Sequence, residues 1–356
     1  MDLSKASFHN TLEKSVLSKD TCTGCCACIV ACPYDCLALV EAKPSLVEKC
    51  GECGICAKVC AQYQWSLSDM ESFSFGRERK VEDVFGVHRR TVVARATDER
   101  ILRVAQDGGV VTALLKCALD SGHVSCAVVS GVDPSKPLYP VPKIASSEVD
   151  LLACAGTRYS YSPNLLALAE AIEKKSAIAF VGTPCQISAI RKLQYAGLKK
   201  YNSVKLLIGL MCSECFDFET LIEQHLHREL KLDLQNVAKI NIKGKLVITM
   251  KDGRVTALPL AEAKQYVRRS CRFCSDFSAE LADVSVGGLG LASWNLAIVR
   301  SEKGEELFSE AEKAGSIQIR DVTEESNALK LLGKLSSKKK ADLASAKDFG
   351  TLEKAA

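Results

Sequence analysis

Eight cysteines near the N-terminus repeat one spacing twice. The two copies are Cys22-x2-Cys25-x2-Cys28-x3-Cys32, followed by Pro33, and Cys50-x2-Cys53-x2-Cys56-x3-Cys60. A [4Fe-4S] cubane needs four thiolates that converge on one small cube, and in such doubled motifs the fourth cysteine ligates the other cluster. The spacing therefore predicts two clusters, one held by Cys22, Cys25, Cys28 and Cys60, the other by Cys50, Cys53, Cys56 and Cys32.

Zinc is the alternative use of densely spaced cysteines, but zinc sites normally use paired CxxC knuckles rather than three cysteines in step plus a fourth. Ala61 stands where a proline usually follows the motif, which removes no ligand. Cys26 and Cys36 are surplus to the eight ligands, and we expect them to be buried small hydrophobic residues. Residues 1–66 are thus predicted to form a small bacterial-ferredoxin-like domain that depends on its metal to fold.

A second group of cysteines lies beyond residue 180. Cys185 and Cys212 each follow a predicted buried strand, Cys215 comes three residues later, and Cys271-x2-Cys274 precedes Asp276-Phe277. The carboxyl ends of parallel strands are where such sheets hold their ligands, so these thiols could converge on a third cubane. The spacing leaves a second reading open, in which free buried cysteines accompany a zinc knuckle.

The elements that would position these groups alternate between strands and helices, which predicts an α/β (α+β) body. We expect strands at 91–96, 124–129, 177–181 and 204–210, and helices at 110–119, 164–174, 187–195, 218–230, 305–314 and 325–335. Segments 239–250 and 255–260 are predicted to pair as a hairpin around Asp252-Gly253, since Asp-Gly suits the turn. The expected organisation is a 1–66 domain, a 67–90 connector, a 91–300 body, and C-terminal helices and tail at 301–356, with the lysines of 336–340 as a solvated tail.

Composition narrows the class of protein. The chain has 356 residues, 47% hydrophobic and 25% charged, which is typical of a soluble globular protein. Its 18 cysteines, and an N-terminus that lacks a signal-like apolar segment, predict a reducing, cytoplasmic setting with no transmembrane segment. A net charge of +4 and only 6% aromatic residues argue against a nucleic-acid partner.

Six motifs, in this order, carry a resemblance to a known family. They are Gln106-Asp107-Gly108-Gly109-Val110-Val111-Thr112, Gly156-Thr157-Arg158-Tyr159, Gly182-Thr183-Pro184-Cys185-Gln186, Gly209-Leu210-Met211-Cys212, Cys271-x2-Cys274-x-Asp276-Phe277 and Ala282-Asp283-Val284-Ser285-Val286-Gly287. Residues 91–300 thereby resemble the family of beta subunits of coenzyme F420-dependent hydrogenases and dehydrogenases. With the N-terminal module, the chain is similar to the electron-input subunits of F420H2 dehydrogenases of methanogenic archaea.

The resemblance implies FAD and one [4Fe-4S] cluster in the body, hence three clusters in all. It implies that reduced F420 gives hydride to FAD and that single electrons leave through the clusters to a partner complex or a ferredoxin. The cluster ligands would be Cys185, Cys212, Cys271 and Cys274, with Cys215 a bystander or a replacement for Cys212. Because the cofactor and the substrate exchange the hydride directly, no catalytic side chain is expected.

The remaining site residues follow from the same resemblance and from charge. Gly108-Gly109 opens the predicted helix 110–119, whose N–H groups could approach a pyrophosphate, and Arg158 could neutralise the flavin or a phosphate. The expected cofactor contacts are Gln106, Asp107, Gly108, Gly109, Thr112, Gly156, Thr157, Arg158, Tyr159, Gly182, Thr183, Lys245 and Asp283. F420 is polyanionic, so its expected contacts are basic: Lys243, Arg268, Arg269 and Arg272.

Several alternatives remain open at this stage. The same chemistry could serve a formate dehydrogenase, a hydrogenase or a heterodisulfide reductase complex, or a free F420H2:ferredoxin oxidoreductase. A partner could also hold the protein at the periphery of a membrane complex. A hypothesis of another class is a non-catalytic electron relay, in which the body only docks the N-terminal module.

Overall fold

The computed structural model describes residues 6–352, with side chains through residue 344. The first residues of the predicted 1–66 domain and the last residues of the predicted 301–356 segment lie outside the described residues. Eight strands form the main sheet in the order β13-β3-β12-β11-β7-β6-β4-β5. Their bounds are β3 (Arg90–Ala96), β4 (Cys126–Val132), β5 (Pro140–Ala145), β6 (Ile178–Gly182), β7 (Val204–Leu210), β11 (Val284–Gly287), β12 (Asn295–Val299) and β13 (Ile317–Asp321). Neighbouring pairs among β4, β6, β7 and β11 are parallel, while β5, β12, β3 and β13 add antiparallel edges. The body is therefore a mixed α/β fold.

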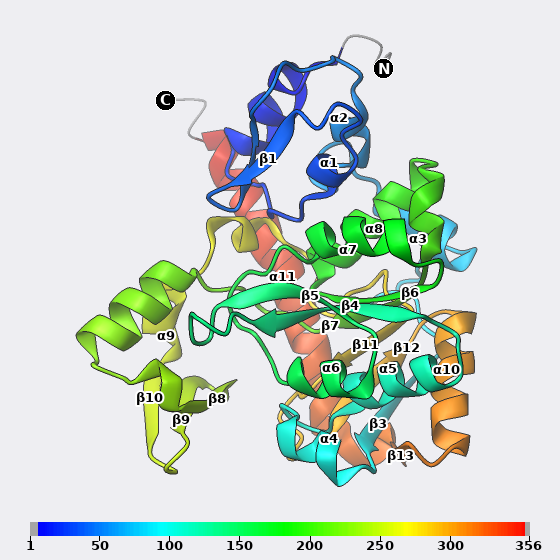
Figure 1. Cartoon of the computed structure of the whole chain (residues 1–356), viewed down its shortest axis with the longest axis vertical. Helices are drawn as coiled ribbons and strands as arrows, with labels where there is room; N and C mark the ends of the chain where they lie inside the picture. Colours follow the sequence, from blue (N-terminus) through cyan, green and yellow to red (C-terminus); the bar gives the residue numbers. More distant parts are fainter. Residues whose placement is uncertain (1–5, 353–356) are drawn as a thin grey trace.

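Helices cover both faces of this sheet (Figure 1). On one face α5 (Val110–Asp120), α6 (Glu148–Ala153) and α10 (Glu302–Lys313) pack through an apolar core that includes Leu114 and Phe308. On the other face α7 (Asn164–Lys174) and α8 (Pro184–Tyr195) pack through Leu168 and Ile190. Burial on both faces explains why β6 is apolar throughout and fully buried.

The other helical segments within residues 90–352 are short, except for two. The short ones are α4 (Glu99–Val104), α9 (Leu260–Ala263), η2 (Lys199–Ser203), η4 (Leu234–Asn236), η5 (Lys264–Tyr266), η6 (Arg269–Phe273) and η7 (Val322–Glu325). The π-helical segment η3 (Phe218–Glu229) covers the small sheet described next, and α11 (Ser326–Leu352) runs along the body as its last element. No helix within residues 6–352 has both the length and the apolar character needed to span a membrane.

The segment predicted to be a two-stranded hairpin forms a separate three-stranded sheet. Segment 239–250 is not one strand but two, β8 (Val237–Ile242) and β9 (Lys245–Met250), which turn at Gly244, where φ is +68°. Glycine is the residue that enters this left-handed conformation without steric cost, and that turn signal was overlooked. The second hairpin, between β9 and β10 (Val255–Pro259) around Asp252-Gly253, is as expected.

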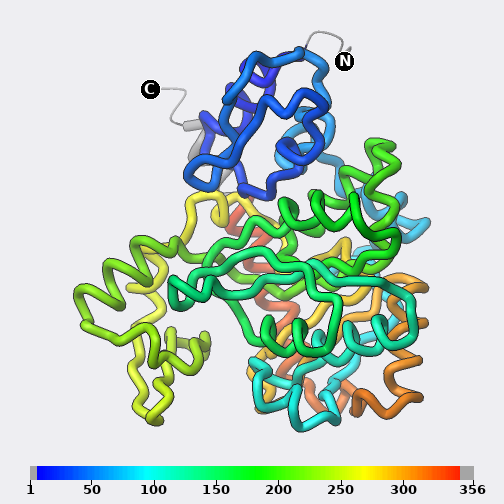
Figure 2. The backbone as a smooth tube through the Cα atoms, in the orientation of Figure 1, coloured from blue at the N-terminus to red at the C-terminus, as the bar shows by residue number. Residues whose placement is uncertain are grey.

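The N-terminal module stands at one end of the body (Figure 2). It contains the π-helical segment η1 (His9–Leu17), α1 (Ala27–Val30), the β1 (Leu37–Val40) and β2 (Lys43–Leu46) ribbon, and α2 (Ile55–Val59). Cys26, Ala27 and Val59 share one apolar cluster with Leu165 and Ile187 of the body. The module is thus packed against the body rather than tethered to it.

Two segments are more ordered than expected. The connector contains α3 (Leu67–Phe75), and its Arg79 pairs with Glu71 and Glu280 at 2.7 and 2.5 Å. The lysines of 336–340 do not form a solvated tail: they belong to α11, whose Lys340 pairs with Glu280 at 3.0 Å. The prediction of a solvated tail is wrong because a run of lysines does not by itself show which of its members face inward once it forms a helix.

Candidate functional site

The first set of N-terminal cysteines comes together around the start of α1. Burial raises the pKa of Cys28 well above its ordinary value, and the nearby Cys25, Cys60 and Cys22 thiols raise it further. Gly24, with φ of +72°, allows the tight turn between Cys22 and Cys25, because a Cβ there would lie 2.6 Å from the carbonyl oxygen of Ala42. The four thiols that the spacing grouped, Cys22, Cys25, Cys28 and Cys60, are therefore neighbours.

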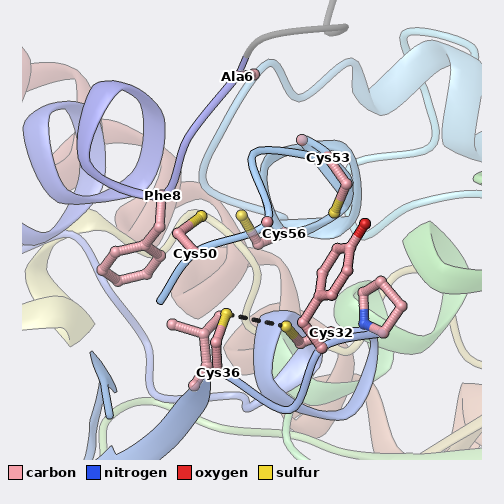
Figure 3. A pocket seen from close by; sticks show the side chains of 12 residues that line it. Ala6, Phe8, Cys32, Cys36, Cys50, Cys53 and Cys56 are labelled. Atoms are coloured by element: carbon pink, nitrogen blue, oxygen red, sulfur yellow. Dashed lines mark hydrogen bonds between the residues drawn. The ribbon is translucent and has the colours of Figure 1, made fainter. Parts of the chain in front are cut away.

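The second set lines a small cavity (Figure 3). Five cysteines line it, the expected Cys32, Cys50, Cys53 and Cys56 together with Cys36, and Phe8 and Pro33 are among its other lining residues. Burial raises the pKa of Cys56 to about 11, with Cys50, Cys53 and Cys32 adding to the effect.

The two surplus cysteines are buried, Cys26 to 2% and Cys36 to 3% exposure, as expected for small hydrophobic residues. Each nevertheless has a polar neighbour. The Cys36 sulfur lies 3.4 Å from that of Cys32, and the Cys26 sulfur lies 3.5 Å from the Tyr161 hydroxyl. Among residues 6–352 no three or more His, Cys, Asp or Glu side chains form a site for a single metal ion.

The body holds a cleft of about 330 Å³ at the carboxyl ends of β6, β7 and β11. Residues that follow these strands form its floor: Thr183 and Cys185 after β6, Met211 and Cys212 after β7, and Gly288 after β11. Crevices at this edge of parallel sheets are the usual ligand sites of α/β folds, and this volume is in the range of small-molecule pockets.

The first turn of α5 and the Arg158 side chain lie together at the cleft. Helix α5 begins there after Gly109, whose φ of +71° turns the chain, and Val111 and Thr112 of its first turn line the cleft. The Arg158 side chain lines it too, and its buried Nε has no hydrogen-bond partner. Burial lowers the pKa of Arg158 below its ordinary value although the nearby Cys154 opposes the shift, and its Nη2 donates to the Ala155 carbonyl oxygen at 3.1 Å.

The second group of cysteines lines the same cleft. Its members are Cys185, Cys212, Cys215, Cys271 and Cys274, and a sixth lining cysteine, Cys154, lies near Arg158 instead. Burial raises the pKa of Cys212 well above its ordinary value, and nearby Cys271, Cys215 and Cys185 add to this although Lys339 opposes it. Cys215 thus belongs to the same set spatially, and the geometry does not separate it from Cys212.

Lys339 of α11 reaches this group from the far end of the sequence. Its Nζ donates to the Cys212 and Asp276 carbonyl oxygens at 2.8 and 3.1 Å and lies 3.4 Å from the Cys274 sulfur. Burial alone would lower the pKa of Lys339, but the surrounding Cys274, Cys212 and Cys271 groups outweigh it and hold the pKa above its ordinary value. Nothing in the local sequence marks this lysine among its neighbours.

Arg268 bridges the cleft and the N-terminal module. Its guanidinium stacks on the Tyr161 ring at 4.2 Å and donates to the Thr23 carbonyl oxygen at 3.1 Å. Cys185 lies close enough to the first set that Cys25 raises the pKa of its thiol. The first and second sets share an apolar cluster that contains Cys28 and Cys56. The three sets of cysteines therefore follow one another from the cleft to the end of the module.

Most of the expected cofactor residues line the cleft, and some do not. Those that do are Gln106, Asp107, Gly109, Thr112, Gly156, Thr157, Arg158, Tyr159, Gly182 and Thr183. Gly108 lies behind the wall, where a Cβ would meet the Asn295 backbone nitrogen at 2.8 Å. Lys245 is exposed on β9, and Asp283 is buried beneath the sheet, where it pairs with Arg191 at 2.9 Å. We therefore leave these three out of the proposed contact residues.

The expected substrate residues divide in the same way. Arg268 lines the cleft, but at its cysteine end, whereas Arg272 is exposed and Arg269 is 80% exposed and pairs with Asp20 at 3.1 Å. Lys243 lies in the turn between β8 and β9, near Asp107, whose pKa burial raises while Lys239 and Lys243 oppose the shift. Lys239, which the sequence analysis missed, donates to the Gln106 carbonyl oxygen at the cleft rim.

Comparisons with known proteins agree with this architecture. Profiles of the N-terminal and C-terminal parts of the coenzyme F420 hydrogenase/dehydrogenase beta subunit match residues 91–169 and 175–325. The beta subunit of the coenzyme F420 hydrogenase of Methanothermobacter thermautotrophicus is 38% identical over 75% of this chain and 98% of its own. A subunit of the F420H2 dehydrogenase of Methanosarcina mazei is 30% identical over 82% of this chain and 83% of its own.

A solved structure supports the same assignment. One chain of the F420-reducing [NiFe] hydrogenase complex from Methanosarcina barkeri superposes with a TM-score of 0.71 and 32% identity, covering 74% of this chain and 92% of that chain. The fold and the ordered motifs point the same way. The chain belongs to the family of coenzyme F420 hydrogenase/dehydrogenase beta subunits.

Proposed function

We propose that this protein oxidises reduced coenzyme F420 by transferring hydride to FAD, and that single electrons leave through three [4Fe-4S] clusters to a partner complex. One observation carries the proposal: one cleft is lined by the buried Arg158 and the N-terminal turn of α5 and also by a group of five thiols, and two further sets of cysteines continue from it. A non-catalytic relay would need the cysteines but not the buried arginine and the helix N-terminus.

The residues of the cleft fit FAD. The unpartnered Nε of Arg158 and the N-terminus of α5 offer donors and positive charge suited to a pyrophosphate. The interior adds apolar surface from Leu115, Val129, Val181 and Val286, against which a planar ring system could pack. A buried cation without a counter-ion is costly, so a bound phosphate would offset that cost.

The cysteines fit iron–sulfur clusters through the chemistry of their donors. Each set offers at least four thiols close to one another. Burial raises their pKa values and so disfavours the free thiolates, and a cationic iron core would offset that cost. When bound, FAD supplies the conversion from hydride chemistry to one-electron chemistry, and the clusters carry the single electrons.

The rim of the cleft fits a polyanionic substrate. Lys239 holds the Gln106 loop through its carbonyl oxygen, and Gln106 in turn donates to the Ile240 carbonyl oxygen at 2.9 Å. These contacts fix β8 against the cleft and place Lys243 close to Asp107. The chain thus orients and attracts the substrate while the reacting atoms belong to F420 and FAD.

Anaerobic turnover with and without flavin tests the proposal. The protein should oxidise F420H2, followed by loss of its oxidised-flavin absorbance and by reduction of a one-electron dye. Arg158→Ala should retain iron but bind FAD weakly, and its F420H2 oxidation should fall with the lost flavin, whereas Arg103→Ala, on the exposed end of α4, should match wild type. F420H2 oxidation by protein that holds no flavin would contradict the proposal, and failure to bind flavin at all would favour the relay.

A further inference from the structure

The last helix contributes to the cleft although it lies beyond the residues that the family profiles match, which end at 325. Helix α11 packs against the body through Ala328 and Leu332, which contact a cluster that includes Phe277 and Ile298. Leu332 and Ser336, both 0% exposed, and Lys339 are spaced four and three residues apart, so they share the inward face of the helix. The packing of α11 therefore fixes where Lys339 lies.

The Lys339 ammonium is held at three points. Two carbonyl oxygens, of Cys212 and Asp276, accept its hydrogen bonds at 2.8 and 3.1 Å, and the third neighbour is the Cys274 sulfur at 3.4 Å. An ammonium has three N–H donors, so this arrangement uses all of them and restricts its motion.

The charge of Lys339 is not neutralised by a carboxylate. Within residues 6–344 no Asp or Glu oxygen lies within 4.0 Å of its Nζ. The next lysine, Lys340, instead pairs with Glu280 at 3.0 Å and donates to the Val84 carbonyl oxygen at 2.7 Å. The positive charge of Lys339 therefore acts on the Cys212, Cys271 and Cys274 thiols and, from more than 4.0 Å away, on the carboxyl groups of Asp276 and Glu214.

We propose that Lys339 is a positioning residue that raises the reduction potential of the cluster held by the third set of cysteines, making it a better first acceptor for electrons from the cleft. This inference rests on the proposed function. The step concerned is the addition of one electron, in which no bond forms or breaks and no proton moves. The added negative charge is stabilised by a nearby cation and by an N–H donor to a ligand sulfur, both of which are known to shift cluster potentials.

A purely structural role is the competing explanation, since Lys339 also ties together the Cys212 and Asp276 backbones. The substitution Lys339→Gln helps to separate the two, because glutamine removes the charge but keeps two N–H donors, on a side chain one bond shorter. Lys339→Arg keeps the charge. Lys338→Gln is the matched control, since it removes the same charge from the exposed neighbouring position of α11.

The experiment is a redox titration of the full-length anaerobic protein followed by electron paramagnetic resonance, with iron measured in each sample. Cys185→Ser identifies the signal of the third cluster by its loss. In Lys339→Gln we expect the iron content to be unchanged. At a fixed solution potential, the ratio of reduced to oxidised third cluster should fall about tenfold, which corresponds to a reduction potential lower by about 59 mV for one electron. The potentials of the other two clusters should not change in Lys339→Gln. In Lys339→Arg and Lys338→Gln the potential of the third cluster should stay near its wild-type value.

A third-cluster potential unchanged in Lys339→Gln would overturn the inference. Iron loss in that variant would overturn it as well, because the lysine would then retain the cluster rather than set its potential. An equal shift in Lys338→Gln would show a general effect of net charge and count against it too. If wild-type protein itself lacks the third cluster, the proposed function fails first, and the iron content makes that case distinguishable.

Discussion

The N-terminal module and the cleft both gather cysteines, but by different means. In the module, short loops between Cys22 and Cys60 bring the thiols together, and tight turns at Gly24 and Gly54, with φ of +72° and +69°, do most of the positioning. In the cleft, the thiols come from loops after β6 and β7, from η6, and the neighbouring cation comes from α11. Local spacing can specify the first arrangement, whereas only sheet topology can specify the second.

The difference extends to the surroundings of the two regions. Cys53 of the module is exposed, while Cys185, Cys212, Cys215, Cys271 and Cys274 of the cleft are all partly buried, and each has Arg268 or Lys339 nearby. Solvent exposure and nearby charge both tune cluster potentials. We therefore propose that electrons enter at the more enclosed cysteines of the cleft and leave through the more exposed set of the module.

The largest expected effect comes from replacing Cys185, the cleft cysteine that lies near Cys25 of the module. Cys185→Ser should lower iron by about four atoms per chain and stop delivery to a one-electron acceptor, while flavin remains bound. Cys117→Ser, a buried cysteine of α5 outside the cleft, is the control and should keep full iron. Iron and flavin analysis checks this, and full iron in Cys185→Ser would remove the residue from the ligand set.

A second pair of variants addresses the fifth thiol of the cleft. If Cys212 is a ligand, as the family resemblance implies, Cys212→Ser loses the third cluster and Cys215→Ser changes iron content little. Both thiols face the cleft, so each variant is the control for the other. The reverse pattern would show that Cys215 has taken the ligand position.

Arg268 and Arg269 both contact the N-terminal module, and we expect their contacts to differ in strength. Arg268→Ala removes a stacking contact at 4.2 Å and a hydrogen bond at 3.1 Å, and should lower the free energy of unfolding by about 2 kcal/mol. Arg269→Ala breaks only an ion pair whose arginine is 80% exposed, and should cost less than about 1 kcal/mol. Denaturant titration of the two variants measures both values, and equal losses would mean that Arg268 does not join the regions.

The smallest expected effect concerns substrate entry. Lys243→Glu should raise KM for F420H2 by about tenfold at low salt, and less at high salt, because it reverses a charge near the cleft rim. Lys251→Glu lies at the other end of β9 and should leave KM near wild type. Steady-state kinetics at two ionic strengths measure the change, and equal effects of both variants would place the substrate elsewhere.

The sequence predicts those parts of the molecule that depend on local sequence patterns. The α7 and β7 bounds, the grouping of the module thiols and most of the cleft residues follow from periodicity, spacing and the family motifs. Gly244 was missed because a single glycine inside an apolar strand pattern is a weak turn signal. Lys339 and Asp283 were misplaced because their surroundings depend on contacts across more than fifty residues of chain, the Lys339–Cys274 contact and the Asp283–Arg191 pair.

The iron content of anaerobically prepared wild-type protein, measured with its flavin and its rate of F420H2 oxidation, tests the central claim most directly. Three clusters predict about twelve irons per chain, together with one FAD. A preparation with about eight irons and full electron delivery would contradict the account, because the thiols of the cleft would then hold no cluster.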